Sequence, residues 1–175
     1  MDDRSFRLGD HGRYVPNKRL NKFHITFGVP EHGWLPVKLQ LDGELFDFDA
    51  SDVLNDPVTE IANAAVQLLR GFSRLTTNWW LEPHWNTLLM CASNTQSDLT
   101  ITLGCLADEN QCDPVSEHSV TLDLRGFCCI IHESLQALRG STTLAEYAAD
   151  SGWGRPFPQD KLDLMQRLLA EPNGT

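Results

Sequence analysis

The chain has 175 residues, of which 41% are hydrophobic and 22% charged, the composition of a single globular domain with a sizeable core. No apolar run approaches the roughly 20 residues of a membrane helix, and the first residues lack the apolar segment of a secretory signal. The five cysteines are odd in number and mostly in apolar contexts, which is typical of reduced, buried thiols. We therefore expect a cytoplasmic protein that does not bind membranes.

Charge is spread unevenly along the chain, whose net charge is −10. Residues 1–20 contain five bases and three acids, whereas residues 21–175 contain nine bases and 21 acids. Between Lys38 and Arg70 there are seven acids and no base, and the interval between Arg74 and Arg125 has the same counts. Such a body repels nucleic acid and attracts basic proteins, although an acidic surface can also serve solubility alone.

The chain divides into a polar, mildly basic arm over 1–20 and a single domain over 21–172. Alternating apolar residues predict strands over 22–29 and 35–41. Asp42-Gly43 predicts a tight turn into a third strand. Closing the hairpin there pairs Leu39 with Phe46 and Val37 with Phe48, because both pairs then share one face. The acids of the third strand take the opposite face.

A helix is predicted to follow the hairpin, with Asp56 as its N-cap and a stop at Arg70-Gly71. Residues 76–93 hold three of the five tryptophans, and we interpret their first part as an irregular joint that returns the chain to the sheet. Strands are expected over 87–92, 99–105 and 119–124, with an exposed acidic loop over 107–117.

After Gly126 the apolar residues are at helical spacing, which predicts a helix that ends at Gly140. Thr143 and Glu146 form a capping box for a short helix, and a last helix is expected over 158–170. The order is β-β-β-α-β-β-β-α-α-α. Because the strands follow one another through short links, we predict an α+β fold with an antiparallel sheet of about six strands and helices packed on one face.

The tryptophan-rich stretch is the best candidate for a ligand pocket. A carboxyl group held against indole rings acquires a raised pKa, and aromatic rings stack on sugars. A small-ligand or carbohydrate-active site is therefore one interpretation, and tryptophans that simply fill the core are the other. The residues of this candidate pocket are Trp79, Trp80, Glu82, His84 and Trp85.

Other chemistry has little support in the sequence. No phosphate-binding loop or nucleophile elbow is present. Cys128 and His132 would share a helix face, but two ligands do not make a zinc site. We name no catalytic residue and expect neither a metal nor a cofactor.

Three short motifs suggest a family. They are Phe23-His-Ile-Thr-Phe27 with Gly33-Trp-Leu-Pro-Val-Lys-Leu39, then Ser51-Asp-Val-Leu-Asn-Asp-Pro57 before a helix, and Trp80-Leu-Glu-Pro83 before two strands. Over roughly residues 22–139, this layout resembles small uncharacterised bacterial proteins, some of which are proposed immunity proteins of polymorphic-toxin systems. The resemblance names no catalytic residue and implies a cytoplasmic, non-enzymatic protein that binds a partner.

Two hypotheses follow: a protein-binding module, such as an acidic immunity-like inhibitor of a basic partner, or an enzyme or ligand-binding protein built on the Trp/Glu pocket. Aromatic side chains surrounded by charged residues are typical of protein–protein interfaces. A homodimer through residues 127–169 is compatible with either. The acids that we expect to contact a basic partner are Asp47, Asp49, Asp52, Asp108, Glu109 and Asp113.

Overall fold

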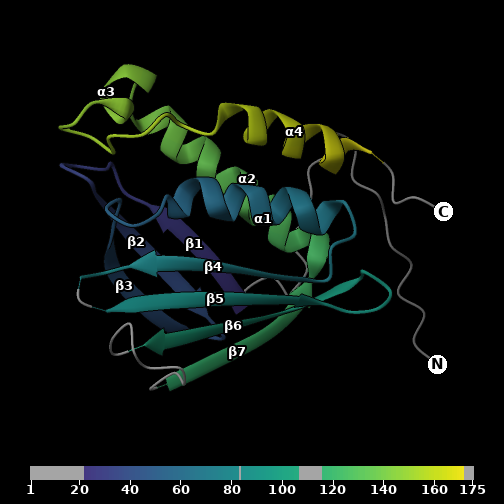
Figure 1. The fold of residues 1–175 in the computed structure, drawn as a ribbon. Helices are drawn as coiled ribbons and strands as arrows, with labels where there is room; N and C mark the ends of the chain where they lie inside the picture. Colours follow the sequence, from purple (N-terminus) through teal and green to yellow (C-terminus); the bar gives the residue numbers. More distant parts are fainter. Residues whose placement is uncertain (1–21, 83, 107–115, 172–175) are drawn as a thin grey trace, which may run out of the picture.

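The computed structural model describes residues 22–82, 84–106 and 116–171, and confirms the α+β class. The described residues form seven strands and four helices (Figure 1). In chain order these are β1 (Phe23–Phe27), β2 (Trp34–Leu41), β3 (Glu44–Ser51), α1 (Pro57–Leu69), β4 (Arg74–Trp80), β5 (Trp85–Ala92), β6 (Asp98–Leu106), β7 (Ser116–Asp123), α2 (Leu124–Ser141), α3 (Leu144–Ala148) and α4 (Gln159–Ala170).

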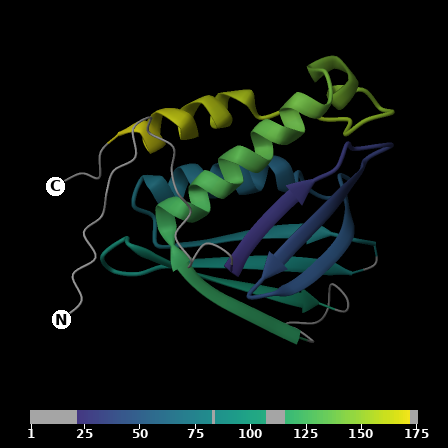
Figure 2. The ribbon, with the colours of Figure 1, turned by 180° about the vertical axis from the view of Figure 1, so that it is seen from behind.

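The strands are divided between two antiparallel sheets. One has the order β1-β2-β3 and the other the order β4-β5-β6-β7. Figures 1 and 2 show the two sheets one behind the other, with their strands running in crossing directions. The sequence predicted one sheet of about six strands. The structure differs in having two sheets, and the additional strand is β4.

The first hairpin has the predicted register. Leu39 pairs with Phe46 and Val37 pairs with Phe48 across β2 and β3. Asp42 and Gly43 both have positive φ, at 47° and 97°, as a type I′ turn requires. Turn chemistry and the apolar pattern therefore select the same pairing.

Strand β4 occupies the segment that the sequence analysis interpreted as an irregular joint. Thr77 and Trp79 point into the core, and Trp80 pairs with Trp85 where β4 and β5 meet the turn. The backbone N–H of Leu81 donates to the carbonyl of His84 at 2.7 Å, which closes that turn. The stretch is a β-hairpin because threonine and tryptophan side chains suit a pleated, half-buried surface.

The helices lie together on one side of the two sheets (Figures 1 and 2). Helix α1 runs along β4, α2 contacts β1, and α4 packs on both α1 and α2. The predicted caps are confirmed: an Asp56 carboxylate oxygen accepts from the Thr59 N–H at 3.1 Å, and Thr143 and Glu146 form the capping box. No helix of the described residues is long and apolar enough to cross a membrane.

The core lies between the sheets and beneath the helices. Trp79 of the four-stranded sheet is stacked on Phe27 and meets Phe48 edge-on, with ring centroids 6.2 and 6.0 Å apart. Phe23 of β1 contacts Phe127 of α2 at 5.0 Å. Large aromatic side chains thus join the two sheets to each other and to the helices.

Candidate functional site

The residues of the predicted Trp/Glu pocket do not converge. Trp79 is 2% exposed and points into the core. Trp80 and Trp85 are half-buried on the opposite, outer face of the same sheet, with their rings edge-on at 5.0 Å. A strand places successive side chains on opposite faces, so neighbouring tryptophans separate.

Glu82 and His84 are exposed in the turn between β4 and β5. A Glu82 carboxylate oxygen accepts a hydrogen bond from the Ser51 hydroxyl at 2.8 Å. The same hydroxyl oxygen accepts from the Val53 N–H at 3.2 Å. Glu82 therefore ties the β4–β5 turn to the end of β3, which is a structural role that the sequence analysis did not predict.

Two of the acids between Lys38 and Arg70 have structural roles. The Asp56 carboxylate accepts from the Thr59 hydroxyl at 2.6 Å and from the Trp153 indole N–H at 3.1 Å. The Glu60 carboxylate accepts from the Asn78 N–H of β4 at 3.1 Å. These carboxylates anchor the start of α1 to a buried indole and to the neighbouring strand.

The other acids of this interval remain at the surface. Asp47 lies 3.6 Å from the Lys38 ammonium across β2 and β3, and both side chains are exposed. Asp49 and Asp52 form no ion pair among the described residues, although the Arg155 guanidinium donates a hydrogen bond to the backbone carbonyl of Asp52. Of the predicted partner-binding acids, Asp47, Asp49 and Asp52 thus lie on or next to β3, whereas Asp108, Glu109 and Asp113 lie outside the described residues.

A group of exposed apolar side chains was not predicted as part of a site. The exposed fractions are 37% for Trp34, 65% for Val53 and 57% for Leu54, and Val29 is also exposed. All four lie where β1 ends, β2 begins and β3 ends, because Trp34 pairs with Ser51. In the sequence, the adjacent pair Val53-Leu54 could have indicated this surface, because it lies in a loop whose apolar residues have neither strand nor helix spacing.

We define the hairpin-end surface as these apolar residues together with the two unpaired acids beside them. Its members are Val29, Trp34, Asp49, Asp52, Val53 and Leu54. Asp49 pairs with Pro36 on the outer side of the sheet. Pro36 is two residues from Trp34 along β2, so both lie on the same face. Apolar side chains and carboxylates that form no ion pair therefore occupy the same end of the three-stranded sheet.

The loop between α3 and α4 supports this end of the sheet, and both views show it beside the β1–β2 turn (Figures 1 and 2). The N–H groups of His32 and Gly33 donate to the carbonyls of Ser151 and Gly152, at 3.0 and 2.8 Å. Gly33 has φ of 79°, and a Cβ there would lie 2.6 Å from an Asp52 carboxylate oxygen. The positive φ of Gly33, more than the movable Asp52 carboxylate, therefore favours glycine at this position.

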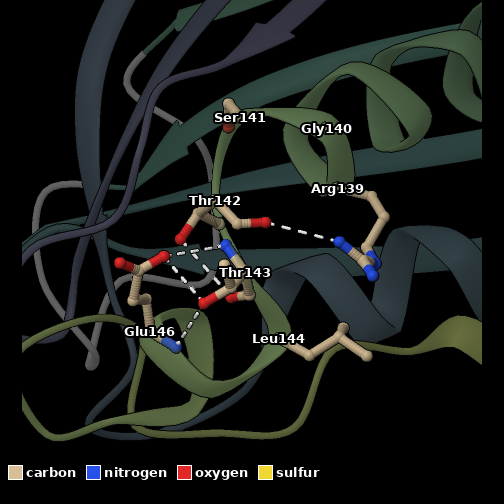
Figure 3. Close-up of a pocket in the computed structure, with 7 residues that line it drawn as sticks. All are labelled: Arg139, Gly140, Ser141, Thr142, Thr143, Leu144 and Glu146. Carbon is tan, nitrogen blue, oxygen red and sulfur yellow. Dashed lines mark hydrogen bonds between the residues drawn. The ribbon is translucent and has the colours of Figure 1, made fainter.

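An open depression of about 450 Å³ lies at the junction of α2 and α3. Figure 3 shows the residues that line it. Its polar groups serve local structure. A Glu146 carboxylate oxygen accepts from the Thr143 hydroxyl at 2.7 Å, and an Arg139 nitrogen donates to the Thr142 carbonyl at 3.4 Å. The hydrogen bonds with Thr143 lower the pKa of the Glu146 carboxyl, so it stays ionised as a cap.

A second cleft, of about 330 Å³, lies between the end of α1 and the β5–β6 turn. Arg125 is at its margin, but the guanidinium donates to the Leu169 carbonyl at 2.8 Å and so caps the end of α4. The Gln96 side-chain oxygen is buried in this region with no hydrogen-bond partner in the described part of the chain. These groups complete the packing of helix ends and do not converge on one point.

The cysteine and histidine residues of α2 do not form a reactive site. Burial raises the pKa of the Cys128 thiol, and the Sγ lies 3.6 Å from the Ala65 carbonyl oxygen. Burial also raises the pKa of Cys129 and lowers that of His132. Within the described ranges, no group of three His, Cys, Asp or Glu side chains could hold a metal ion.

Comparison of this chain with protein-family models, with curated proteins and with solved structures gives no match.

Proposed function

We propose that the protein is a non-enzymatic binding module that recognises a basic protein through the hairpin-end surface. The observation that carries this proposal is the placement of exposed Trp34, Val53 and Leu54 beside the unpaired carboxylates of Asp49 and Asp52. Apolar anchors within a charged rim are the usual anatomy of a protein interface. The carboxylates would steer a basic partner, and the apolar side chains would hold it.

An immunity-like inhibitor is the form of this function that the family resemblance implies. Such a protein acts by covering a surface of a toxin, and many toxins that cleave nucleic acids are basic. An acidic surface with an exposed tryptophan has the charge and the anchor for that task. The alternative, a ligand pocket around residues 79–85, has less support because Trp79 and Trp80 point to opposite faces of the sheet.

The proposal is tested by measuring association with a captured partner for two triple variants of equal charge. The test variant replaces Asp47, Asp49 and Asp52 by lysine. The control variant replaces the exposed acids Glu133, Asp163 and Glu171 by lysine, which changes the net charge by the same amount on the helical side. We expect the association rate at low salt to fall about tenfold or more for the test variant and little for the control.

A second variant, Trp34→Ala, tests the anchor separately. Loss of this exposed tryptophan is expected to raise the dissociation rate about tenfold or more and to leave the salt dependence unchanged. A partner that binds the Asp47/Asp49/Asp52 variant as quickly as the wild type at low salt, and that tolerates Trp34→Ala, would show that its binding site lies elsewhere.

A further inference from the structure

Strand β3 forms an open edge of the three-stranded sheet. The Asp52 N–H donates to the Gly33 carbonyl at 3.0 Å, and in this register every second residue of β3 is hydrogen-bonded to β2. The residues between them direct their backbone N–H and C=O groups away from β2. No described residue forms a hydrogen bond with these groups at Leu45, Asp47 and Asp49. A row of backbone donors and acceptors is therefore available to an additional strand.

The edges of β1 and β4 are closed by side chains. The Ser134 hydroxyl of α2 donates to the Ile25 carbonyl of β1 at 2.6 Å. At the edge of β4, the Asn78 N–H donates to the Glu60 carboxylate at 3.1 Å, and the Asn55 side chain donates to the Asn78 carbonyl at 2.6 Å. Natural sheets commonly cover their edges in this way, so the open edge of β3 distinguishes it from these two strands.

The acids of β3 determine which kind of strand its edge can accept. Asp47 and Asp49 lie on the outer face, directly opposite the positions of alternate residues in an added strand. Lys38 lies 3.6 Å from Asp47 on the β2 side, whereas Asp49 forms no ion pair with a described residue. Strand β3 itself contains no basic residue. Charge complementarity therefore favours lysine or arginine opposite these acids, and the same acids would repel the β3 edge of a second copy.

The open edge lies between two contacts with the four-stranded sheet. At one end, the Glu44 carboxylate contacts the His118 imidazole of β7. At the other end, the Ser51 hydroxyl donates to the turn between β4 and β5 at 2.8 Å. Between these contacts, Phe46 and Phe48 point inward but are only half-buried. An added strand with apolar residues on its inner face would cover the parts of the two rings that remain exposed.

We propose that β3 binds an extended segment of a basic protein as an additional antiparallel strand. This inference rests on the proposed function and specifies how the partner is held. Antiparallel pairing continues the arrangement of the whole sheet and is the more stable of the two directions. The segment would place basic residues opposite Asp49 and Asp47, and apolar residues beside the two phenylalanines. Backbone pairing would supply affinity, and the alternate side chains would supply specificity.

A short synthetic peptide, acetyl-Thr-Val-Lys-Val-Lys-Val-Thr-amide, is the probe. Titration calorimetry at low salt is expected to give a dissociation constant of about 10–500 µM. Methylation of the two lysine amides keeps the charges but removes donors that face β3, so binding should weaken about tenfold or more. The matched control carries methyl groups on two valine amides, which face away from β3, and should bind like the parent peptide. A neutral peptide with threonine in place of lysine should bind about tenfold more weakly.

Two substitutions at one position separate the backbone from the charge. Asp47→Pro and Asp47→Ala remove the same carboxylate, but only proline also removes the N–H that points away from β2. Both should keep the hairpin, because proline is tolerated where the N–H of an edge strand faces solvent. The peptide should bind Asp47→Pro about fivefold more weakly than Asp47→Ala. Circular dichroism checks that both are folded.

Strand β7 provides the control for proline in an edge strand. The Leu124 N–H donates to the Ser97 carbonyl at 3.0 Å, and in this register the Ser119 N–H points away from β6. Ser119→Pro therefore removes an equivalent N–H from a different edge. It should leave the affinity for the peptide unchanged.

Amide hydrogen exchange distinguishes failure of this inference from failure of the proposed function. With the peptide bound, the N–H groups of Leu45, Asp47 and Asp49 should exchange about tenfold more slowly. Absence of this protection, no binding at about 1 mM peptide, or equal binding by Asp47→Pro and Asp47→Ala would overturn the added strand. Self-association through β3 that excludes the peptide would also overturn it. In each case the proposed function would stand if a basic partner still responded to Trp34→Ala and to the lysine triple variant.

Discussion

The outer faces of the two sheets differ although their inner faces share one core. On the three-stranded sheet, Lys38 and Asp47 form an exposed ion pair and Asp49 has no cationic partner among the described residues. On the four-stranded sheet, hydroxyl pairs such as Thr102 with Ser119 occupy the equivalent cross-strand positions. Because alternate residues of a strand face opposite ways, the outward positions can change without changing the core. The fold therefore constrains the inner positions, whereas the outer ones can vary in charge and polarity.

The largest effect is expected at Trp79, which points into the core between two outward-facing neighbours. It tests whether inner and outer positions of a strand contribute differently to stability. Trp79→Ala removes a side chain that packs on Phe27 and Phe48 of the other sheet. We expect the free energy of unfolding to fall by about 3–5 kcal/mol, since the change leaves a cavity between the sheets. Urea denaturation followed by circular dichroism measures this loss.

Trp80→Ala is the control, because Trp80 is adjacent in sequence but half-buried on the outer face. Its loss of unfolding free energy should be clearly smaller, below about 2 kcal/mol, because less apolar surface leaves water when Trp80 folds into place. Equal losses for the two variants would show that the indoles do not divide between an inner and an outer face.

The second test compares the stability contribution of Asp56, which caps a helix, with that of the acids that face solvent. Asp56→Ala removes the N-cap of α1 and leaves the Trp153 indole N–H without its acceptor inside the protein. We expect a loss of about 2–3 kcal/mol, combining a lost cap with a buried unsatisfied donor. Thermal or urea unfolding provides the measurement.

Asp56→Asn keeps an oxygen in place for both the Thr59 N–H and the indole, so it should recover most of that loss. Asp49→Ala, on the exposed face, should change the stability by less than about 0.5 kcal/mol. If Asp56→Asn were as damaging as Asp56→Ala, the negative charge would matter more than the two hydrogen bonds.

Local signals in the sequence predicted the elements that short-range chemistry determines. The Asp42-Gly43 turn specified the first hairpin, and the Asp56 cap with Gly71 bounded α1. Strand β4 was missed although its threonines and tryptophans favour strand. The alternation of apolar and polar residues in β4 is weak. One inward position is the polar residue Thr77, and one outward position is the aromatic residue Trp80. The separation into two sheets depends on contacts between distant segments, such as Trp79 with Phe48, which no local pattern reveals.

The candidate site was predicted only in part. The acids on and beside β3 follow from the hairpin register, which puts Asp47 and Asp49 on the outer face. The apolar part of the hairpin-end surface could not be predicted, because an exposed tryptophan at a strand end has the same sequence pattern as a buried one. Trp34 and Trp79 both lie in strands, and only the placement of the neighbouring loops leaves one at the surface.

The smallest effects distinguish the two outer faces by their response to salt. Asp47→Ala removes an ion pair of 3.6 Å between two exposed side chains, and should cost about 0.2–0.5 kcal/mol at low salt. Thr102→Val keeps the branched shape and removes a hydroxyl pair, with a similar cost of up to about 0.5 kcal/mol. Urea denaturation at low and high NaCl, in dilute protein, should show the first loss disappear and the second persist, because salt screens exposed charges but not neutral hydroxyl pairs. A loss for Asp47→Ala that is independent of salt would mean that its side chain acts through packing, and the electrostatic contrast between the two faces would then be smaller than their composition implies.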